Sequence, residues 1–292
     1  MHMNNPFSKD YDEQADNNLI ESALNNSEQA LVDLISKHQN YIYNVAFKMV
    51  LSPYDAEDIT QDVIIKIITK LGQFNRKSSF RTWVYRITVN HVLNMKKKWL
   101  EERYNTFPLY ENDLDNITTQ SLTELEKIEM KDTIEEARLG CMAGMLLCLS
   151  REQRIVFILG EIFGVPQNIA SEILEISKDN FRQRLTRARH DIYQFMQRKC
   201  GLINKNNPCR CPKKTKGFIK EGWVDPDNMK FYTHYTKRIN EIVVDKDDML
   251  KNMEYLEYRN LQREHPFQEK DIIQNILQNI LNNDNVKSIF EL

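Results

Sequence analysis

The stretch that decides the fold is SPYDAEDITQDVIIKIITKLGQFNRKSSFRTWVYRITVNHVLNMKKK, residues 52–98. Ser52, Pro53 and Asp55 fit an N-cap, a first-turn proline and an acid at the third helical position. Gly72 fits the residue after the end of that helix. Between them an apolar stripe recurs at helical spacing, formed by Ile59, Val63, Ile64, Ile67, Ile68 and Leu71. The pattern predicts an amphipathic helix.

The charge of this stretch changes sign along its length. Residues 55–62 carry four acids and no base, and residues 76–98 carry seven bases and no acid. Interaction with the helix dipole explains Asp55 well, but Asp62, two turns further on, less well. A solvated surface is one interpretation of the basic run. Because aromatic and short polar residues are mixed with the lysines and arginines, the run favours contact with the phosphates and unstacked nucleobases of a nucleic acid.

The basic half also predicts a helix with two different faces. We expect the core side of this helix to contain Phe80, Trp83, Val84, Ile87 and His91. The other face would then carry Thr82, Arg86, Val89, Asn90 and Leu93.

Residues 55–90, DAEDITQDVIIKIITKLGQFNRKSSFRTWVYRITVN, resemble region 2 of bacterial RNA polymerase sigma factors, in the extracytoplasmic-function (ECF) group of the sigma-70 family. The resemblance implies that the clamp of core RNA polymerase contacts Asp55, Asp58, Gln61 and Asp62. It also implies that a flipped base of the melted minus-ten element is surrounded by Phe74, the loop Asn75, Arg76, Lys77, Ser78 and Ser79, and Asn90. Phosphates would be bound by Arg76, Lys77, Arg81 and Arg86. Flipping costs stacking energy, so polar groups must meet the edge of the base.

Composition predicts an all-α protein with room for two or three small domains. The segments described below divide it into two small helical domains joined by an acidic linker, with a mainly helical C-terminal extension. The chain has 292 residues, 41% of them hydrophobic, and only 8 Gly and 8 Pro. Its net charge of −2 conceals basic and acidic segments that cancel. No apolar run reaches the ~20 residues of a membrane span, and no signal core is present at the N-terminus. Five cysteines fit reduced thiols, so we predict a cytoplasmic protein without membrane insertion.

The N-terminal part divides into two segments. Residues 1–17 are rich in Asn and Asp, and we expect them to be disordered apart from contacts of Phe7 and Tyr11. Residues 18–99 form the first domain, with a short helix over 19–24 and a longer one over 27–51. His38 lies on the apolar stripe of the longer helix and is interpreted as a core histidine.

An acidic segment separates the first domain from a second one. Residues 100–137 carry eleven acids and three bases, which predicts a linker. Solubility alone would explain this composition. In the ECF family the corresponding linker threads through the polymerase cleft, where an acidic chain can mimic nucleic acid.

The second domain covers residues 138–199 and contains a helix-turn-helix pattern. Ser150 and Gln153 fit a capping box, and Gly164 fits the end of that helix. Two further helices, 166–174 and 178–198, are separated by three residues. The predicted core is Ile169, Ala170, Ile173, Ile176, Phe181 and Leu185. Residues 178–189 carry five bases against Asp179, which suits a helix in the major groove.

Residues 149–189, LSREQRIVFILGEIFGVPQNIASEILEISKDNFRQRLTRAR, resemble sigma region 4, which reads the minus-thirty-five element and binds the polymerase flap. By that resemblance Arg182, Gln183, Thr186 and Arg187 face bases of double-stranded promoter DNA. Arg184 and Arg189 would contact phosphates or the protein itself, and Lys178 is a further candidate for DNA binding. The chain departs from the family at Asn168, where a glutamate is usual, and at Glu175, where the turn usually has a glycine. Glu175 would have to adopt a positive φ in the turn, a conformation that glycine adopts freely and glutamate does not. An anti-sigma factor is a further candidate partner.

Residues 200–292 extend beyond the family pattern. Cys200, Cys209 and Cys211 could hold a structural zinc with His234 as a fourth ligand, although their spacing lacks paired CxxC motifs. Redox sensing is the alternative, because nearby lysines would favour thiolates. Amphipathic helices are expected around residues 250–261 and 272–281. We interpret the extension as a regulatory module that docks on the sigma domains or on a partner.

No catalytic pattern is found: the chain has no phosphate-binding glycine loop, no HExxH and no nucleophile elbow. We therefore predict a non-enzymatic sigma factor that brings core polymerase to promoters and helps to melt the minus-ten element. One alternative is a helix-turn-helix regulator that does not bind polymerase. The other is a metal- or redox-responsive adaptor that acts through residues 200–292.

Overall fold

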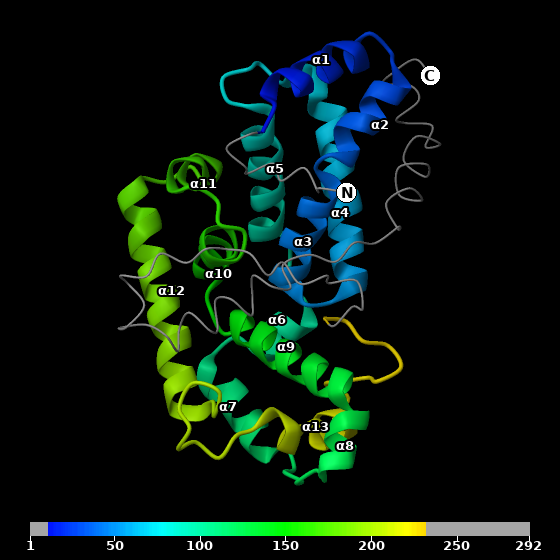
Figure 1. The fold of residues 1–292 in the computed structure, drawn as a ribbon. Coiled ribbons are helices and arrows are strands. Elements are labelled where there is room, and N and C mark those ends of the chain that lie inside the picture. Colours follow the sequence, from blue (N-terminus) through cyan, green and yellow to red (C-terminus); the bar gives the residue numbers. More distant parts are fainter. Residues whose placement is uncertain (1–10, 232–292) are drawn as a thin grey trace. The chain divides into compact units, whose positions relative to one another are not determined.

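The computed structural model describes residues 11–231 of the chain (Figure 1). These residues form two compact units: unit 1 contains residues 11–96 and 164–181, and unit 2 contains residues 97–163 and 182–231. Within residues 11–231 the regular elements are helices, with one isolated bridge between Cys200 and Cys209. The all-α prediction is therefore confirmed for the described chain.

Unit 1 begins with three helices, α1 (Glu13–Leu24), α2 (Glu28–Ser36) and α3 (Gln39–Val50). Asp12 and Ser27 cap the first two, accepting hydrogen bonds from the backbone N–H of Ala15 and Ala30 at 3.0 and 3.3 Å. Two expectations change here. Part of the segment expected to be disordered is helical, and the single helix expected over 27–51 breaks at Lys37 and His38 into α2 and α3.

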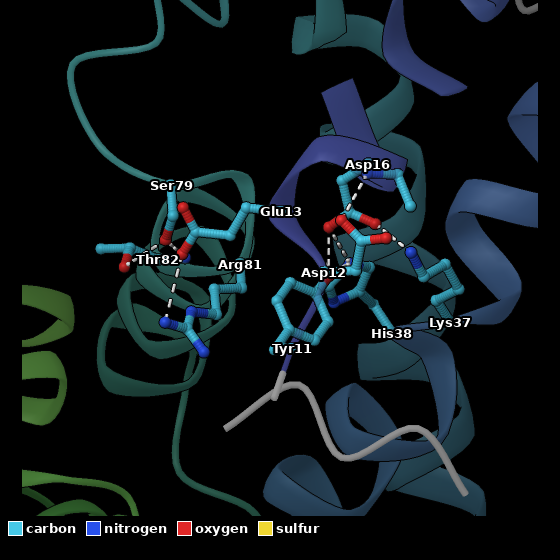
Figure 2. Close-up of polar contacts among 10 residues, drawn as sticks. Tyr11, Asp12, Glu13, Asp16, Lys37, His38, Ser79, Arg81 and Thr82 are labelled. Atoms are coloured by element: carbon cyan, nitrogen blue, oxygen red, sulfur yellow. Dashed lines mark hydrogen bonds and ion pairs between the residues drawn. The ribbon is translucent and has the colours of Figure 1, made fainter. Parts of the chain in front are cut away.

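A buried polar cluster fixes the start of α1 to this bundle (Figure 2). The Tyr11 hydroxyl donates to the Asp16 carboxylate and lies 3.0 Å from His38 Nε2, and Lys37 also pairs with Asp16. Burial by itself would raise the pKa of Asp16, but hydrogen bonds from His38, Lys37 and Tyr11 hold it below its usual range. Burial lowers the pKa of His38, which is 1% exposed. His38 is thus the core histidine expected from the sequence.

Residues 52–98 form the next two helices of unit 1. Helix α4 (Pro53–Lys70) has Ser52 as its N-cap and continues into the short 3-10 helix η1 (Leu71–Gln73), and α5 (Phe80–Asn94) follows after a loop. All six residues of the predicted apolar stripe are buried, as are Val84, Tyr85, Val89 and Val92 on α5. The capping and periodicity of the sequence therefore placed α4 correctly.

The helix-turn-helix is formed by α11 (Gln167–Ile173) and α12 (Lys178–Lys199). Ala170, Ile173, Phe181 and Leu185 of the predicted core are buried, and Ile169 and Ile176 are half-buried. Glu175 adopts a left-handed φ of 53° in the turn, so the chain makes this turn without glycine. Such a conformation costs a non-glycine residue about 1 kcal/mol.

Residues 100–137, which were expected to be a linker, lie in unit 2 and are folded. It forms α6 (Trp99–Arg103), α7 (Phe107–Asn116), α8 (Glu124–Glu129) and the start of α9 (Lys131–Leu147). Then follow α10 (Arg151–Phe157), capped by the predicted Ser150–Gln153 box, and the π-helical turn η2 (Ile158–Ile162). Gly164 follows with a φ of 62°, as expected of the residue after the helix end.

Helix α13 (Cys211–Lys220) explains why the acidic segment folds. Lys214, 7% exposed, donates from Nζ to the carbonyl oxygens of Leu114 and Ile117 at 2.8 and 2.5 Å. The ring of Trp223 stacks on Phe218 and on Tyr110, with centroids 5.3 and 5.7 Å apart. Residues far apart in the sequence, which composition assigned to a linker and to an extension, thus share one hydrophobic core.

The last described residues close this module. The Glu136 carboxylate, 2% exposed, accepts the backbone N–H groups of Lys230 and Phe231 at 2.7 and 2.9 Å. The part of the extension expected to dock therefore includes residues 211–231. The helices expected around 250–261 and 272–281 lie outside the described residues.

Candidate functional site

The first candidate surface is the exposed side of α4. Ser52 Oγ accepts the Asp55 N–H at 3.4 Å, and Pro53 fills the first turn, which orients the acids that follow. Asp58 and Asp62 are exposed one turn apart, and Asp55 and Gln61 are half-buried beside them. Asp62 lies 3.7 Å from His91 Nε2 of α5. Burial and then the charge of Lys66 lower the pKa of His91, so the acids dominate this face.

The second candidate surface is the loop between η1 and α5. Phe74 is half-buried against Phe80 and Trp83, with ring centroids 5.4 Å from each. Arg76 has a left-handed φ of 57°, and Asn75 Oδ1 accepts the Lys77 N–H at 3.2 Å, which turns the loop. Ser79 then caps α5 through Thr82 N–H at 3.3 Å. The loop thus presents polar groups directly beside a half-buried aromatic cluster.

Three arginines expected to bind phosphates have carboxylate partners within unit 1. Arg76 pairs with Glu21 at 2.8 Å. Arg81 pairs with Glu13 at 3.1 Å (Figure 2). Arg86 lies 3.4 Å from the Glu175 carboxylate and donates to the Glu172 carbonyl at 3.0 Å. Arg81 is 14% exposed and also lies over the Tyr11 ring, so it supports the start of α1. Lys77 and Asn90 are exposed, and Ser78 and Ser79 are half-buried.

The two faces predicted for α5 need correction. Thr82 and Val89, expected on the face away from the core, are each 2% exposed. Trp83, Ile87 and His91, expected in the core, are only half-buried. The reason is that α5 packs on several neighbours within unit 1, so its buried sector is wider than a single stripe and is rotated from the predicted one.

The third candidate surface lies on α12. Arg182, Gln183, Thr186 and Arg187 are all exposed, at positions that share one side of a helix. Lys178 is exposed at the start of this helix, and Arg184 is half-buried. Arg189 pairs with the Glu161 carboxylate, which is 2% exposed, and so holds α12 to η2. Arg189 therefore has a structural partner in this unit.

The cysteines gather more closely than the sequence indicated. Cys200 and Cys209 lie opposite each other across the isolated bridge, and Cys211 begins α13. Burial raises the pKa of Cys209 and raises that of Cys211 to about 12, and Cys141 on α9 is close enough to interact with all three. None of the five cysteines forms a disulfide. Sequence reasoning missed Cys141, because no spacing rule joins it to the others.

A metal site is not formed by these thiols as they stand. Among residues 11–231 no group of three or more His, Cys, Asp and Glu side chains is arranged to hold a metal ion. His234, the suggested fourth ligand, lies outside the described residues. Zinc binding therefore stays a prediction of the sequence.

Comparison with known proteins decides which family carries these surfaces. The model of sigma-70 region 2 matches residues 34–99, and the model of sigma-70 region 4 matches residues 139–192. The chain thus contains segments that match two regions of the sigma-70 family. The two matches coincide with the α4–α5 surfaces and with the helix-turn-helix, and they leave the segment between them and residues 193–292 outside either model.

Curated proteins similar to this chain include ECF sigma factors. It is 25% identical to the ECF RNA polymerase sigma factor SigW of Bacillus subtilis, over 59% of this chain and 92% of SigW. It is 24% identical to the ECF RNA polymerase sigma factor SigE of Mycolicibacterium smegmatis, over 56% of this chain and 60% of SigE. A structure of CnrH in complex with the cytosolic domain of CnrY matches 63% of this chain at 21% identity, with a TM-score of 0.45. The similarity to SigW and SigE confirms the ECF resemblance.

The helices of residues 11–231 were also compared with the requirements of a membrane span. None of them combines the length and the apolar character that crossing a bilayer requires.

Proposed function

We propose that this chain recruits core RNA polymerase to promoters and uses binding free energy to open the minus-ten element. The observation that carries the proposal is the pair of family matches over residues 34–99 and 139–192, combined with an exposed acidic face in the first and an exposed basic face in the second. Acidic and basic surfaces on one chain suit two partners of different charge.

The polymerase contact would be made by α4. Asp58 and Asp62 are exposed on the same side, and Asp55 and Gln61 lie beside them. Tyr54, 77% exposed at the start of α4, adds an aromatic side chain to this acidic surface. Aromatic residues inside a charged rim are typical of protein interfaces. Because the face lies in the region 2 match, we assign it the partner that the resemblance implies, the clamp of the large subunit.

Melted minus-ten DNA would bind at the η1–α5 loop. A flipped base needs an aromatic or apolar surface and polar groups for its edge, and the loop offers Phe74 with Asn75, Ser78 and Ser79. Arg76 and Arg86 would have to exchange their carboxylate partners for phosphates. Because these pairs are partly exposed, each exchange costs no more than about 1 kcal/mol.

The minus-thirty-five element would be read by α12. Arg182 and Gln183 in its first turns, with Thr186 and Arg187 one turn later, form the exposed face. An arginine bonded to both acceptors of a guanine supplies about 1–3 kcal/mol of discrimination.

The test is binding to purified core polymerase, followed by run-off transcription from a pool of genomic promoters. The full chain should bind core and yield promoter-specific transcripts. Asp58→Lys should abolish core binding, because it reverses an exposed charge of the α4 face. Glu129→Lys, a charge reversal at an exposed site of α8, should keep it. Failure of the full chain to bind core would refute the proposal, and core binding without transcripts would favour the adaptor alternative.

A further inference from the structure

Trp99 is the feature of unit 2 that the proposed function leaves unexplained. It is the first residue of α6 and is 65% exposed. Trp83 and Trp223 are both half-buried in aromatic clusters. Burying a large aromatic side chain stabilises a fold substantially, so the exposure of Trp99 forgoes that stabilisation.

Buried ion pairs of Glu101 attach the helix that carries Trp99 to the rest of unit 2. Glu101, 2% exposed, accepts hydrogen bonds from Arg151 Nε and Nη2 at 2.9 and 2.7 Å and from Arg154 Nη1 at 2.8 Å. Its other contact is the backbone N–H of Lys98 at 3.1 Å, which closes the first turn. Burial by itself would raise the pKa of Glu101, but the bond from Arg151 and the charge of Arg154 hold it below its usual value. Because Glu101 is fixed in this way, Trp99, two residues earlier, is held at the surface.

One cation contacts the tryptophan, and two lysines precede it in the sequence. The Arg103 guanidinium lies over the ring, 5.4 Å from its centroid, and is itself held by Asp113 at 3.0 Å. Lys97 is exposed and Lys98 half-exposed immediately before Trp99, and Glu102 is the exposed acid of α6. A cation over one face of an indole leaves the other face available for a planar partner.

We propose that Trp99, together with Lys97 and Arg103, is a stacking site for an unpaired base of single-stranded DNA. Every base has a π-face, and a lysine beside the platform neutralises the backbone phosphate. The proposal deepens the proposed function, on which it rests for the source of the strand: the melted promoter. Trp99 is also the last residue of the segment that matches sigma-70 region 2, the region to which the proposed function assigns the melted strand.

The test titrates the full chain with a labelled 12-nucleotide oligo-dT at low salt, and reads both anisotropy of the label and tryptophan emission. We expect strand binding to quench emission in the wild type, and the quench to be smaller in Trp99→Phe, which keeps Trp83 beside the minus-ten loop. Trp99→Ala should weaken binding by about 5- to 100-fold, the range that loss of one stacked base predicts. Trp99→Phe should lose less affinity, because a phenyl ring still stacks. Lys97→Glu should weaken binding and flatten its salt dependence.

Ile128→Ala is the matched control, since Ile128 is a 74% exposed apolar residue on the acidic helix α8. It should bind oligo-dT as the wild type does, and circular dichroism should show all variants folded. Wild-type emission that does not respond to the strand, or equal affinity of wild type and Trp99→Ala, would overturn the site. So would loss of core polymerase binding in Trp99→Ala with oligo-dT affinity intact, which would make this a protein contact. A tenfold preference for oligo-rU over oligo-dT would also overturn it, because RNA would then be the ligand. The titration contains no polymerase, so failure of the proposed function would be seen separately, in core binding by the wild type.

Discussion

Replacing the buried Lys214 by methionine tests whether the extension holds the acidic segment folded. Its Nζ donates to two carbonyl oxygens at the end of α7, from Leu114 and Ile117, both nearly buried. Methionine keeps the length of the chain but removes both donors. Each carbonyl left without a partner costs about 1–3 kcal/mol, and the lower desolvation cost of methionine offsets part of it. We expect unit 2 to lose about 2–4 kcal/mol of unfolding free energy.

The assay is urea unfolding of the full chain, followed by circular dichroism and by tryptophan emission. Trp223 reports on unit 2, because its ring stacks on Phe218 and Tyr110 in the core that α13 shares with α7. Lys213→Met is the matched control, since this neighbouring lysine on α13 has an exposed side chain. Its free energy of unfolding should stay within about 0.5 kcal/mol of the wild type. If Lys214→Met behaved as Lys213→Met does, the capping argument would be refuted.

Run-off transcription with the same two variants connects this contact to function. If the acidic segment has to leave α13 before it can enter the polymerase, Lys214→Met should be more active per bound polymerase than Lys213→Met. Lower activity would mean that the folded module is itself the active form.

Three further predictions concern the other sites. Glu101→Gln should destabilise unit 2 by about 3–5 kcal/mol in urea unfolding at pH 7, because Arg154, 2% exposed, would lose its buried partner. The folded-state pKa of Glu101 is lowered, so this stabilisation is present above the unfolded value of about 4.3 and is lost as the pH falls below it. Arg182→Ala should weaken binding to a minus-thirty-five duplex by about 1–3 kcal/mol in anisotropy titrations and relax specificity at one base pair. Phe74→Ala should lower permanganate reactivity of minus-ten thymines in the polymerase complex while core affinity is unchanged.

Each of these predictions has its own control. The unfolding free energy of the wild type should fall more steeply with decreasing pH than that of Glu101→Gln. If it does not, the assignment of the ion pair is wrong. Gln194→Ala, an exposed change further along α12, should leave duplex binding as it is. Leu24→Ala, at a 47% exposed apolar residue of α1, should melt promoters normally. If it reduced melting as much as Phe74→Ala, the role given to the loop would be wrong.

Capping residues and turn residues in the sequence were sufficient to predict where several helices begin and end. Ser52 and Pro53 start α4, the Ser150 box starts α10, and Gly164 ends the segment after it, because caps act through the nearest backbone groups. The exposed face of α12 could also be predicted, since Arg182 and Thr186 share a side of any helix. Both family regions were recognisable for the same reason, as each is a continuous run of sequence.

Tertiary structure decided what depends on partners distant in the chain. Composition made residues 100–137 a linker, yet Lys214 and Trp223 supply the donors and the apolar surface that let α7 fold, from about a hundred residues away. The buried side of α5 was misjudged because a helix packed on several neighbours is not buried along a single stripe. Cys141 joined the other thiols, and Glu101 found Arg151 and Arg154, only when separate helices came together. Periodicity and capping are written in neighbouring residues, whereas burial and charge pairing are properties of the assembled fold.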